Sequence, residues 1–166
     1  KSFKELGVPT RPETILPSAN EKGTVKLSKT AKGWKFESVA AKSGKKLLFE
    51  IKPATGTLSD IICTYNNKTF KPMDGGGLYW ALNNIYPVKP ESLLAPNSKQ
   101  IKARLKNFVQ KGNKLTLYWL YTIGNNVYSS TWILEVVDNT LIADIRSSSA
   151  MVGEFKFGAI TGISGK

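Results

Sequence analysis

The sequence predicts an all-β protein, a single-domain antiparallel β-sandwich of jelly-roll-like type. Short segments of alternating apolar and polar residues recur at intervals of about 8–12 residues, with turn residues between them and no long amphipathic helix. A chain of 166 residues suits one domain and buries enough surface to need no disulfide or metal for stability. A closed lipocalin-like β-barrel is the alternative, because the chain length and the Gly33-Trp34 pair near the first strands also fit it.

The clearest element is the uncharged stretch over residues 115–134. These twenty residues carry no charge, although 22% of the chain is charged. Large side chains alternate up to Ile123, and Gly124-Asn125-Asn126 then supplies residues that tolerate positive φ before a second run that ends at Val136. A transmembrane helix is a poor interpretation, because this turn lies at its middle and β-branched and aromatic residues dominate. The pattern predicts a hairpin of two central strands covered on both faces.

The other elements follow from shorter patterns. Residues 1–22 contain three prolines and no sustained period, so we expect an extended arm there, an all-β domain over residues 23–160, and a tail over residues 161–166. Since the chain begins with Lys1 and not Met, we expect a processed protein or a piece of a longer one. Alternation predicts further strands at residues 24–29, 34–39, 47–51, 58–65, 69–71, 78–82, 100–108, 141–146 and 151–157.

The formal net charge of +12 is unevenly distributed along the chain. Residues 114–166 hold four basic and four acidic side chains, so the whole excess lies before the predicted hairpin. Much of it falls in Lys-rich turns at residues 29–33 and 42–46. Such an imbalance describes partners more than fold, and it favours a polyanionic partner.

The most concrete candidate surface is the strand predicted over residues 100–108. Apolar residues at every second position would face the core, and the cations between them would form an outward row about 7 Å apart. These cations are Lys102, Arg104 and Lys106. Such a row could follow a chain of carboxylates, sulfates or phosphates, with Arg104 offering bidentate hydrogen bonds. The alternative is a solvated edge strand whose cations block aggregation.

Aromatic residues supply the second set of candidates. Tyr79 and Trp80 follow a Gly-rich loop at residues 75–77 that could border a binding edge. Trp119 and Trp132 are predicted core residues, because alternation places them inside the hairpin sheet. Tyrosines of the same hairpin have polar tips that tolerate water, and we expect them to reach a groove; they are Tyr118, Tyr121 and Tyr128.

Catalytic chemistry has little support in the sequence. The chain has no His, which removes the commonest general base and metal ligand along with every Ser-His-Asp arrangement. Its one cysteine, Cys63, reads as a small buried residue. We therefore expect no cofactor and no bound metal. An enzyme, such as one with two carboxylates across a cleft, is the less favoured interpretation.

These observations favour a non-catalytic binding module for a polysaccharide, held by the basic sheet face and aromatic contacts, and the basic charge favours an acidic polysaccharide. An extracellular or cell-surface location goes with that hypothesis. Two alternatives remain open. One is single-stranded nucleic-acid binding, in which cations neutralise phosphates and rings stack on bases. The other is a structural subunit that docks on an acidic protein partner.

Overall fold

A computed structural model describes residues 22–81 and 92–163, which form β-strands and one 3-10 turn. The strands are β1 (Gly23–Thr30), β2 (Gly33–Ala40), β3 (Lys46–Ile51), β4 (Ile61–Tyr65), β5 (Lys68–Asp74), β6 (Gly77–Ala81), β7 (Leu93–Leu94), β8 (Ile101–Lys111), β9 (Lys114–Ile123), β10 (Asn126–Val137), β11 (Thr140–Ser147), β12 (Val152–Lys156) and β13 (Ala159–Thr161). The 3-10 turn, η1 (Leu58–Asp60), directly precedes β4.

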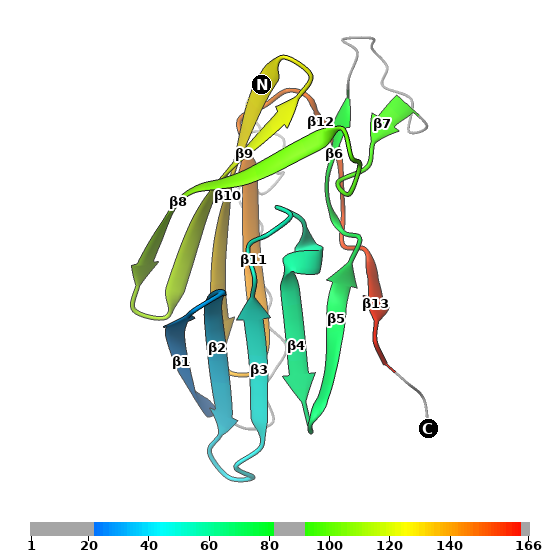
Figure 1. The fold of residues 1–166 in the computed structure, drawn as a ribbon. Helices are drawn as coiled ribbons and strands as arrows, with labels where there is room; N and C mark the ends of the chain where they lie inside the picture. Colours follow the sequence, from blue (N-terminus) through cyan, green and yellow to red (C-terminus); the bar gives the residue numbers. More distant parts are fainter. Residues whose placement is uncertain (1–21, 82–91, 164–166) are drawn as a thin grey trace, which may run out of the picture.

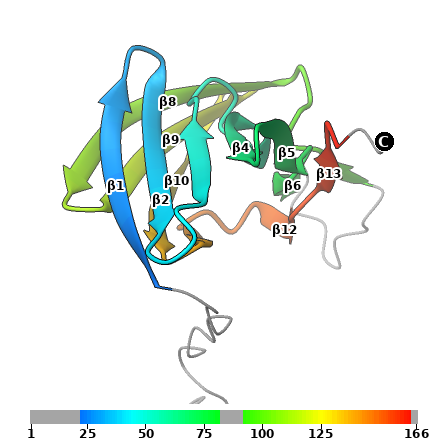
Figure 2. The ribbon, with the colours of Figure 1, turned by 90° about the horizontal axis from the view of Figure 1, so that it is seen from below.

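The strands form two main layers. One is a six-stranded sheet in the order β1-β2-β3-β4-β5-β13, the other a four-stranded sheet in the order β11-β10-β9-β8, and β12-β6-β7 make a small third sheet. Figures 1 and 2 show the four-stranded sheet lying behind β1–β3. The predicted antiparallel sandwich is confirmed. Most neighbouring strands in both main sheets follow one another along the chain, as in a meander, so the likeness to a jelly roll lies in the layered architecture.

The alternative of a closed lipocalin-like barrel is wrong. The six-stranded sheet ends at β1 and β13, and the four-stranded sheet ends at β11 and β8, so neither closes on itself or on the other. The Asn113 side chain in the β8–β9 turn links the two sheets instead: its Nδ2 donates to Val25 O at 2.8 Å, and its Oδ1 accepts from Leu27 N at 3.2 Å. Chain length alone could not distinguish an open from a closed sheet.

The hairpin predicted over residues 115–134 is confirmed as β9 and β10. They pair in antiparallel register with Tyr121 opposite Tyr128, and they occupy the middle of the four-stranded sheet. Gly124 takes φ of 58° in the connecting turn, a conformation that suits glycine. Cover on both faces is not what the structure shows, however: Tyr118 on the outer face is 37% exposed. Within the described residues, no helix is long and apolar enough to cross a membrane.

The core lies between the inner faces of the two sheets. Trp119 and Trp132 are each 1% exposed, and their ring centroids lie 5.8 Å apart. Across the sandwich, Trp34 of β2 meets Phe108 of β8 edge-on with 4.8 Å between ring centroids. Ser38 of β2 adds a polar link between the layers, because its hydroxyl donates to the carbonyl of Asp138 in the β10–β11 turn.

The ends of the domain fall only partly within the described residues. Of the predicted arm, residues 1–21 lie outside them, and Lys22 accepts a backbone hydrogen bond from Ala41 at 2.9 Å. Of the predicted tail, residues 164–166 lie outside them, whereas Thr161 belongs to β13 and its hydroxyl donates to Asp74 at 2.9 Å. The arm and the domain limits stay predictions.

Trp119→Ala should lower the free energy of unfolding by about 3–5 kcal/mol, because it empties a buried site at the centre of the core. The matched control is Tyr118→Thr, one residue earlier on the outer face of the same strand, which should change stability by about 0.5 kcal/mol. Chemical denaturation of the parent and both variants measures the difference. Equal losses in the two variants would contradict the assignment of inner and outer faces.

Candidate functional site

The basic strand is β8, at one edge of the four-stranded sheet. Its first half alternates as predicted: Ile101, Ala103 and Leu105 are half-buried and pack against the core, whereas Lys102, Arg104 and Lys106 are exposed. Lys102 lies opposite Thr122 and Arg104 opposite Leu120, both on the outer face of β9. Two cations therefore stand at alternate positions on an open sheet face.

The third cation departs from the predicted even row. The pairing of β8 with β9 shifts between Leu105 and Asn107, so Lys106 is the extra residue of a β-bulge and has no partner on β9. A bulge disrupts the ladder and re-aims the local side chains. Lys106 is exposed beside the pair formed by Lys102 and Arg104 without continuing their regular spacing.

Tyr118 lies on the same outer face as these cations. It pairs with Asn107 of β8 on one side and with Thr131 of β10 on the other. At 37% exposure, its ring is open to solvent next to the bulge. Of the predicted aromatic residues, the structure brings Tyr118 together with the basic strand.

The three cations in the first half of β8 differ from many other cations of the protein in their ion pairing. In residues 22–81 and 92–163, none of Lys102, Arg104 and Lys106 has an acidic side chain within ion-pair distance. Over the same residues, six other cations do have carboxylate partners; they are Lys35, Lys52, Lys71, Lys114, Arg146 and Lys156. The charge of β8 is therefore not neutralised by the part of the protein that the structure describes.

Two predicted ligand-binding residues belong to the core. Trp80 is 1% exposed and Tyr121 is 2% exposed, so neither ring reaches a ligand at the surface. The polar tip of Tyr121 is satisfied inside, since its hydroxyl donates to Gly56 O and lies 3.0 Å from the Ser130 hydroxyl. Burial raises the pKa of this phenol. The expectation that the tip would seek water was therefore wrong.

The remaining two aromatic candidates lie apart from β8. Tyr128 is half-buried on the inner face of β10 and stacks on Trp80, with 5.3 Å between ring centroids. Tyr79 lies on β6 in the small sheet, where the protein's own Lys156 places its ammonium 4.7 Å from the ring centroid. Neither residue joins the surface that carries Lys102 and Arg104.

One acidic side chain, Asp60, has a structural role, because it fixes the loop before η1 by hydrogen bonds. Asp60 is 4% exposed, and its carboxylate accepts hydrogen bonds from the backbone N–H groups of Ala54, Thr55 and Gly56 at 2.9–3.2 Å. The Thr55 hydroxyl donates to it at 2.7 Å. Burial raises the pKa of Asp60, and these hydrogen bonds offset part of that rise. Among the described residues, no three His, Cys, Asp or Glu side chains form a group that could hold a metal ion.

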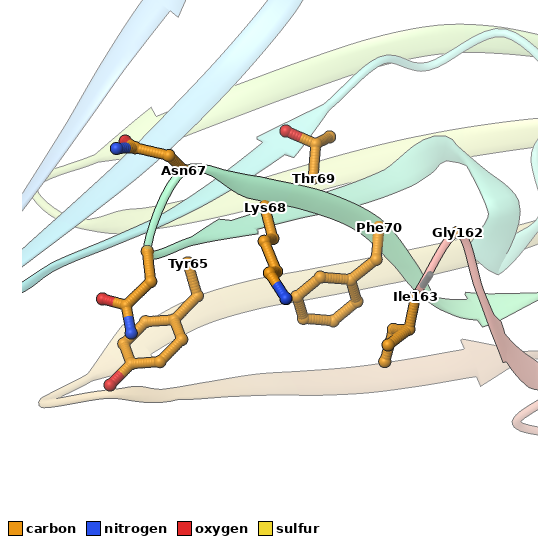
Figure 3. Close-up of a pocket in the computed structure, with 8 residues that line it drawn as sticks. Tyr65, Asn67, Lys68, Thr69, Phe70, Gly162 and Ile163 are labelled. Carbon is orange, nitrogen blue, oxygen red and sulfur yellow. The ribbon is translucent and has the colours of Figure 1, made fainter. Parts of the chain in front are cut away.

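A pocket of about 480 Å³ that the sequence analysis did not identify lies at the β4–β5 hairpin. Its lining residues are Tyr65, Asn66, Asn67, Lys68, Thr69, Phe70, Gly162 and Ile163. Figure 3 shows Tyr65, Lys68, Phe70 and Ile163 extending to one side of the hairpin, and Asn67 and Thr69 to the other. Applying strand alternation on both sides of Asn66 and Asn67 would have placed Tyr65 and Lys68 on one face, because they are direct partners.

Comparisons with known proteins give no further assignment: no protein-family model, no curated protein and no solved structure matches this chain. The candidate surfaces are therefore judged on their own chemistry.

The two aspartates with shifted pKa values predict opposite dependences of stability on pH. For Asp60 the folded-state pKa is raised, so its contribution is complete below the unfolded value of about 3.9 and is lost as pH rises through the folded value. For Asp74 the pKa is lowered by hydrogen bonds from Ser59 and Thr161 and by Lys71, so its contribution is lost as pH falls through the folded value.

Unfolding free energies measured between about pH 3 and about pH 7 test this pair of assignments. The difference between the parent and Asp60→Asn should shrink as pH rises, whereas the difference between the parent and Asp74→Asn should grow. Asp60→Asn should also cost about 1–3 kcal/mol at low pH, because the new amide group turns a donor toward backbone N–H groups. The same pH trend in both variants would contradict the account.

Proposed function

We propose that this protein is a non-catalytic module that binds an acidic polysaccharide along the outer face of β8 and β9. The observation that carries the proposal is the group of three exposed cations on β8, Lys102, Arg104 and Lys106, which have no ion-pair partner within residues 22–81 and 92–163. Side chains two residues apart on a strand are about 7 Å apart, so an extended polyanion could contact more than one of them.

Electrostatic binding of this kind needs several contacts at once and is sensitive to salt. A single pair of exposed charges at about 4 Å gains only about 1 kcal/mol in water, so several contacts must act together. Exposed charges are also screened over a Debye length of about 8 Å at physiological ionic strength. Binding by this face should therefore weaken steeply as salt rises. Neutral glycans should not be retained by it.

The position of Tyr118 supports a sugar partner over a nucleic acid. One exposed ring beside the cations can stack on the apolar face of a sugar residue. Sequence-tolerant binding of single strands relies on rings that stack on successive bases. With Trp80 and Tyr121 buried, the predicted aromatic set leaves Tyr118 next to β8 for that purpose.

The competing explanation is that the cations of β8 serve only to protect this edge strand against aggregation. It is an edge strand, and natural sheets place Lys and bulges on such edges to prevent pairing with another chain. An acidic protein partner docking on the same cations is the other alternative. Charge reversal and a panel of ligands distinguish these readings.

The triple variant Lys102→Glu, Arg104→Glu and Lys106→Glu should lose retention on a heparin-type matrix at low salt and stay folded, because exposed substitutions change stability by about 0.5 kcal/mol each. The control reverses three exposed cations of the Lys-rich turns, Lys32, Lys42 and Lys45, which gives the same change in net charge. That control should elute close to the parent. Parental retention of the β8 variant, or equal losses in both variants, would overturn the proposal.

A ligand panel at two salt concentrations tests the kind of partner. We expect an acidic polysaccharide to bind more tightly than a single-stranded oligonucleotide of matched charge, and both to weaken as salt rises. Tighter binding of the oligonucleotide would favour the nucleic-acid alternative. If neither polymer binds the protein with its β8 cations intact, protection against aggregation would be the remaining explanation of these cations.

A further inference from the structure

A second ligand site is indicated by Lys68, a cation on the inner face of the six-stranded sheet, where the neighbouring side chains pack in the core. Along β4 and β5 the inner face begins in the core, where Cys63 is 3% exposed opposite the half-buried Phe70. Two residue pairs nearer the turn, on the same face, Tyr65 is 41% exposed and lies opposite Lys68, which is also exposed. Burial along this face therefore ends before the hairpin does. An ammonium group stands where the alternation would otherwise place a core side chain.

The space beside these side chains has a second wall from the end of the chain. Strand β13 pairs with β5 only as far as Thr161 opposite Lys71, and Gly162 and Ile163 then border the pocket. A Cβ atom on Gly162 would lie 3.3 Å from the Cα of Phe70, so a glycine allows this close approach. Ile163 is 61% exposed and extends to the same side as Phe70 (Figure 3).

The polar groups of the pocket are not used by the described protein. Within residues 22–81 and 92–163, the Lys68 ammonium, the Asn66 and Asn67 amides and the Tyr65 hydroxyl have no hydrogen-bond or ion-pair partner. The Thr69 hydroxyl, by contrast, lies 2.9 Å from that of Thr64 and points away from Lys68 (Figure 3). The available chemistry is thus one cation, amide groups and two aromatic rings.

That combination selects the ligand class. An apolar ligand would make no use of the Lys68 ammonium or of the Asn66 amide. A small inorganic anion would make no use of Tyr65 and Phe70, whose rings suit the apolar face of a sugar. A pocket of about 480 Å³ lies within the usual range of about 300–1,000 Å³ for small-ligand sites. An anionic sugar ring satisfies the ammonium, the Asn66 amide and the rings together.

We propose that the pocket at the β4–β5 hairpin binds one sugar ring that carries a carboxylate, with Lys68 pairing with the carboxylate and Tyr65 stacking on the ring. The amide of Asn66, which also lines the pocket, hydrogen-bonds a ring hydroxyl. This site lies on a different sheet from β8 and does not depend on the function proposed for Lys102 and Arg104. The alternative role of Lys68 is that of an inward-pointing charge that discourages strand pairing at the end of β5.

The test is an amide chemical-shift titration of the full chain with a methyl hexuronoside, and with the neutral methyl hexoside as the reference ligand. We expect saturable shifts at Asn66, Asn67, Lys68 and Gly162 with the uronoside. The neutral hexoside should bind about tenfold more weakly or worse, because a charge-assisted contact is lost. Absence of saturable shifts, or equal affinity for the two ligands, would overturn the proposal.

Matched variants locate the binding. Lys68→Gln and Tyr65→Ala should each weaken uronoside binding about tenfold or more. Lys71→Gln, which makes the same charge change on β5 but removes an ammonium already 3.6 Å from Asp74, should bind as the parent does. Amide spectra of each variant show whether it is folded, and Tyr65→Phe is a second variant that keeps the ring if Tyr65→Ala unfolds. Parental affinity in Lys68→Gln, or an equal loss in Lys71→Gln, would refute the site.

The β8 reversal variant separates the two proposals. With Lys102, Arg104 and Lys106 changed to Glu, the uronoside shifts at Asn66 and Gly162 should persist even though the polymer is no longer retained. Loss of both signals in that variant would contradict an independent pocket.

Discussion

The two-residue alternation of β9 and β10 is the constraint on which the rest of the structure depends. Trp119 and Trp132 lie fully buried on one face of this hairpin, against the six-stranded sheet. A shift of one residue in the pairing would turn one of the two indoles toward solvent, so the register is fixed by the hydrophobic effect. Because β8 pairs with β9, the same register holds Lys102 and Arg104 on the outside. The basic face is therefore a consequence of how the core is packed.

Local patterns predicted much of the fold, and non-local pairings account for what was missed. The hairpin and the alternation of β8 up to Leu105 could be read from neighbouring residues, because each strand repeats every two residues. The bulge at Lys106 could not, since it arises from the match between β8 and β9. The two-residue strand of Leu93 and Leu94 was not among the predicted strands either, because it is defined by its pairing with β6. Whether the two sheets stay open also depends on which of their edge strands pair, and this is decided by contacts between segments far apart in the sequence.

The candidate site shows the same division. The sequence analysis identified the exposed cations of β8 but placed Trp80 and Tyr121 at the ligand-binding surface, although both are buried. Residue type does not reveal whether the polar group of an aromatic side chain is hydrogen-bonded inside the protein. Tyr121 hydrogen-bonds Gly56 in a turn sixty-five residues away, and Asp60 holds that turn in place. The pocket at Tyr65 and Lys68 was missed for a different reason: it forms between the β4–β5 hairpin and Gly162 and Ile163, which follow β13. Local patterns do not show that these two distant segments of the sequence lie side by side.

The central claim is that the outer face of β8 and β9 is where an acidic polysaccharide binds. Amide chemical-shift mapping with a sulfated oligosaccharide that carries no carboxylate tests it most directly, because the position of the ligand is observed without changing the protein. The account predicts shifts concentrated at Lys102, Arg104, Lys106 and Tyr118 that disappear as salt rises. Shifts centred on the Lys-rich turns at residues 29–33 and 42–46, with β8 unaffected, would contradict it.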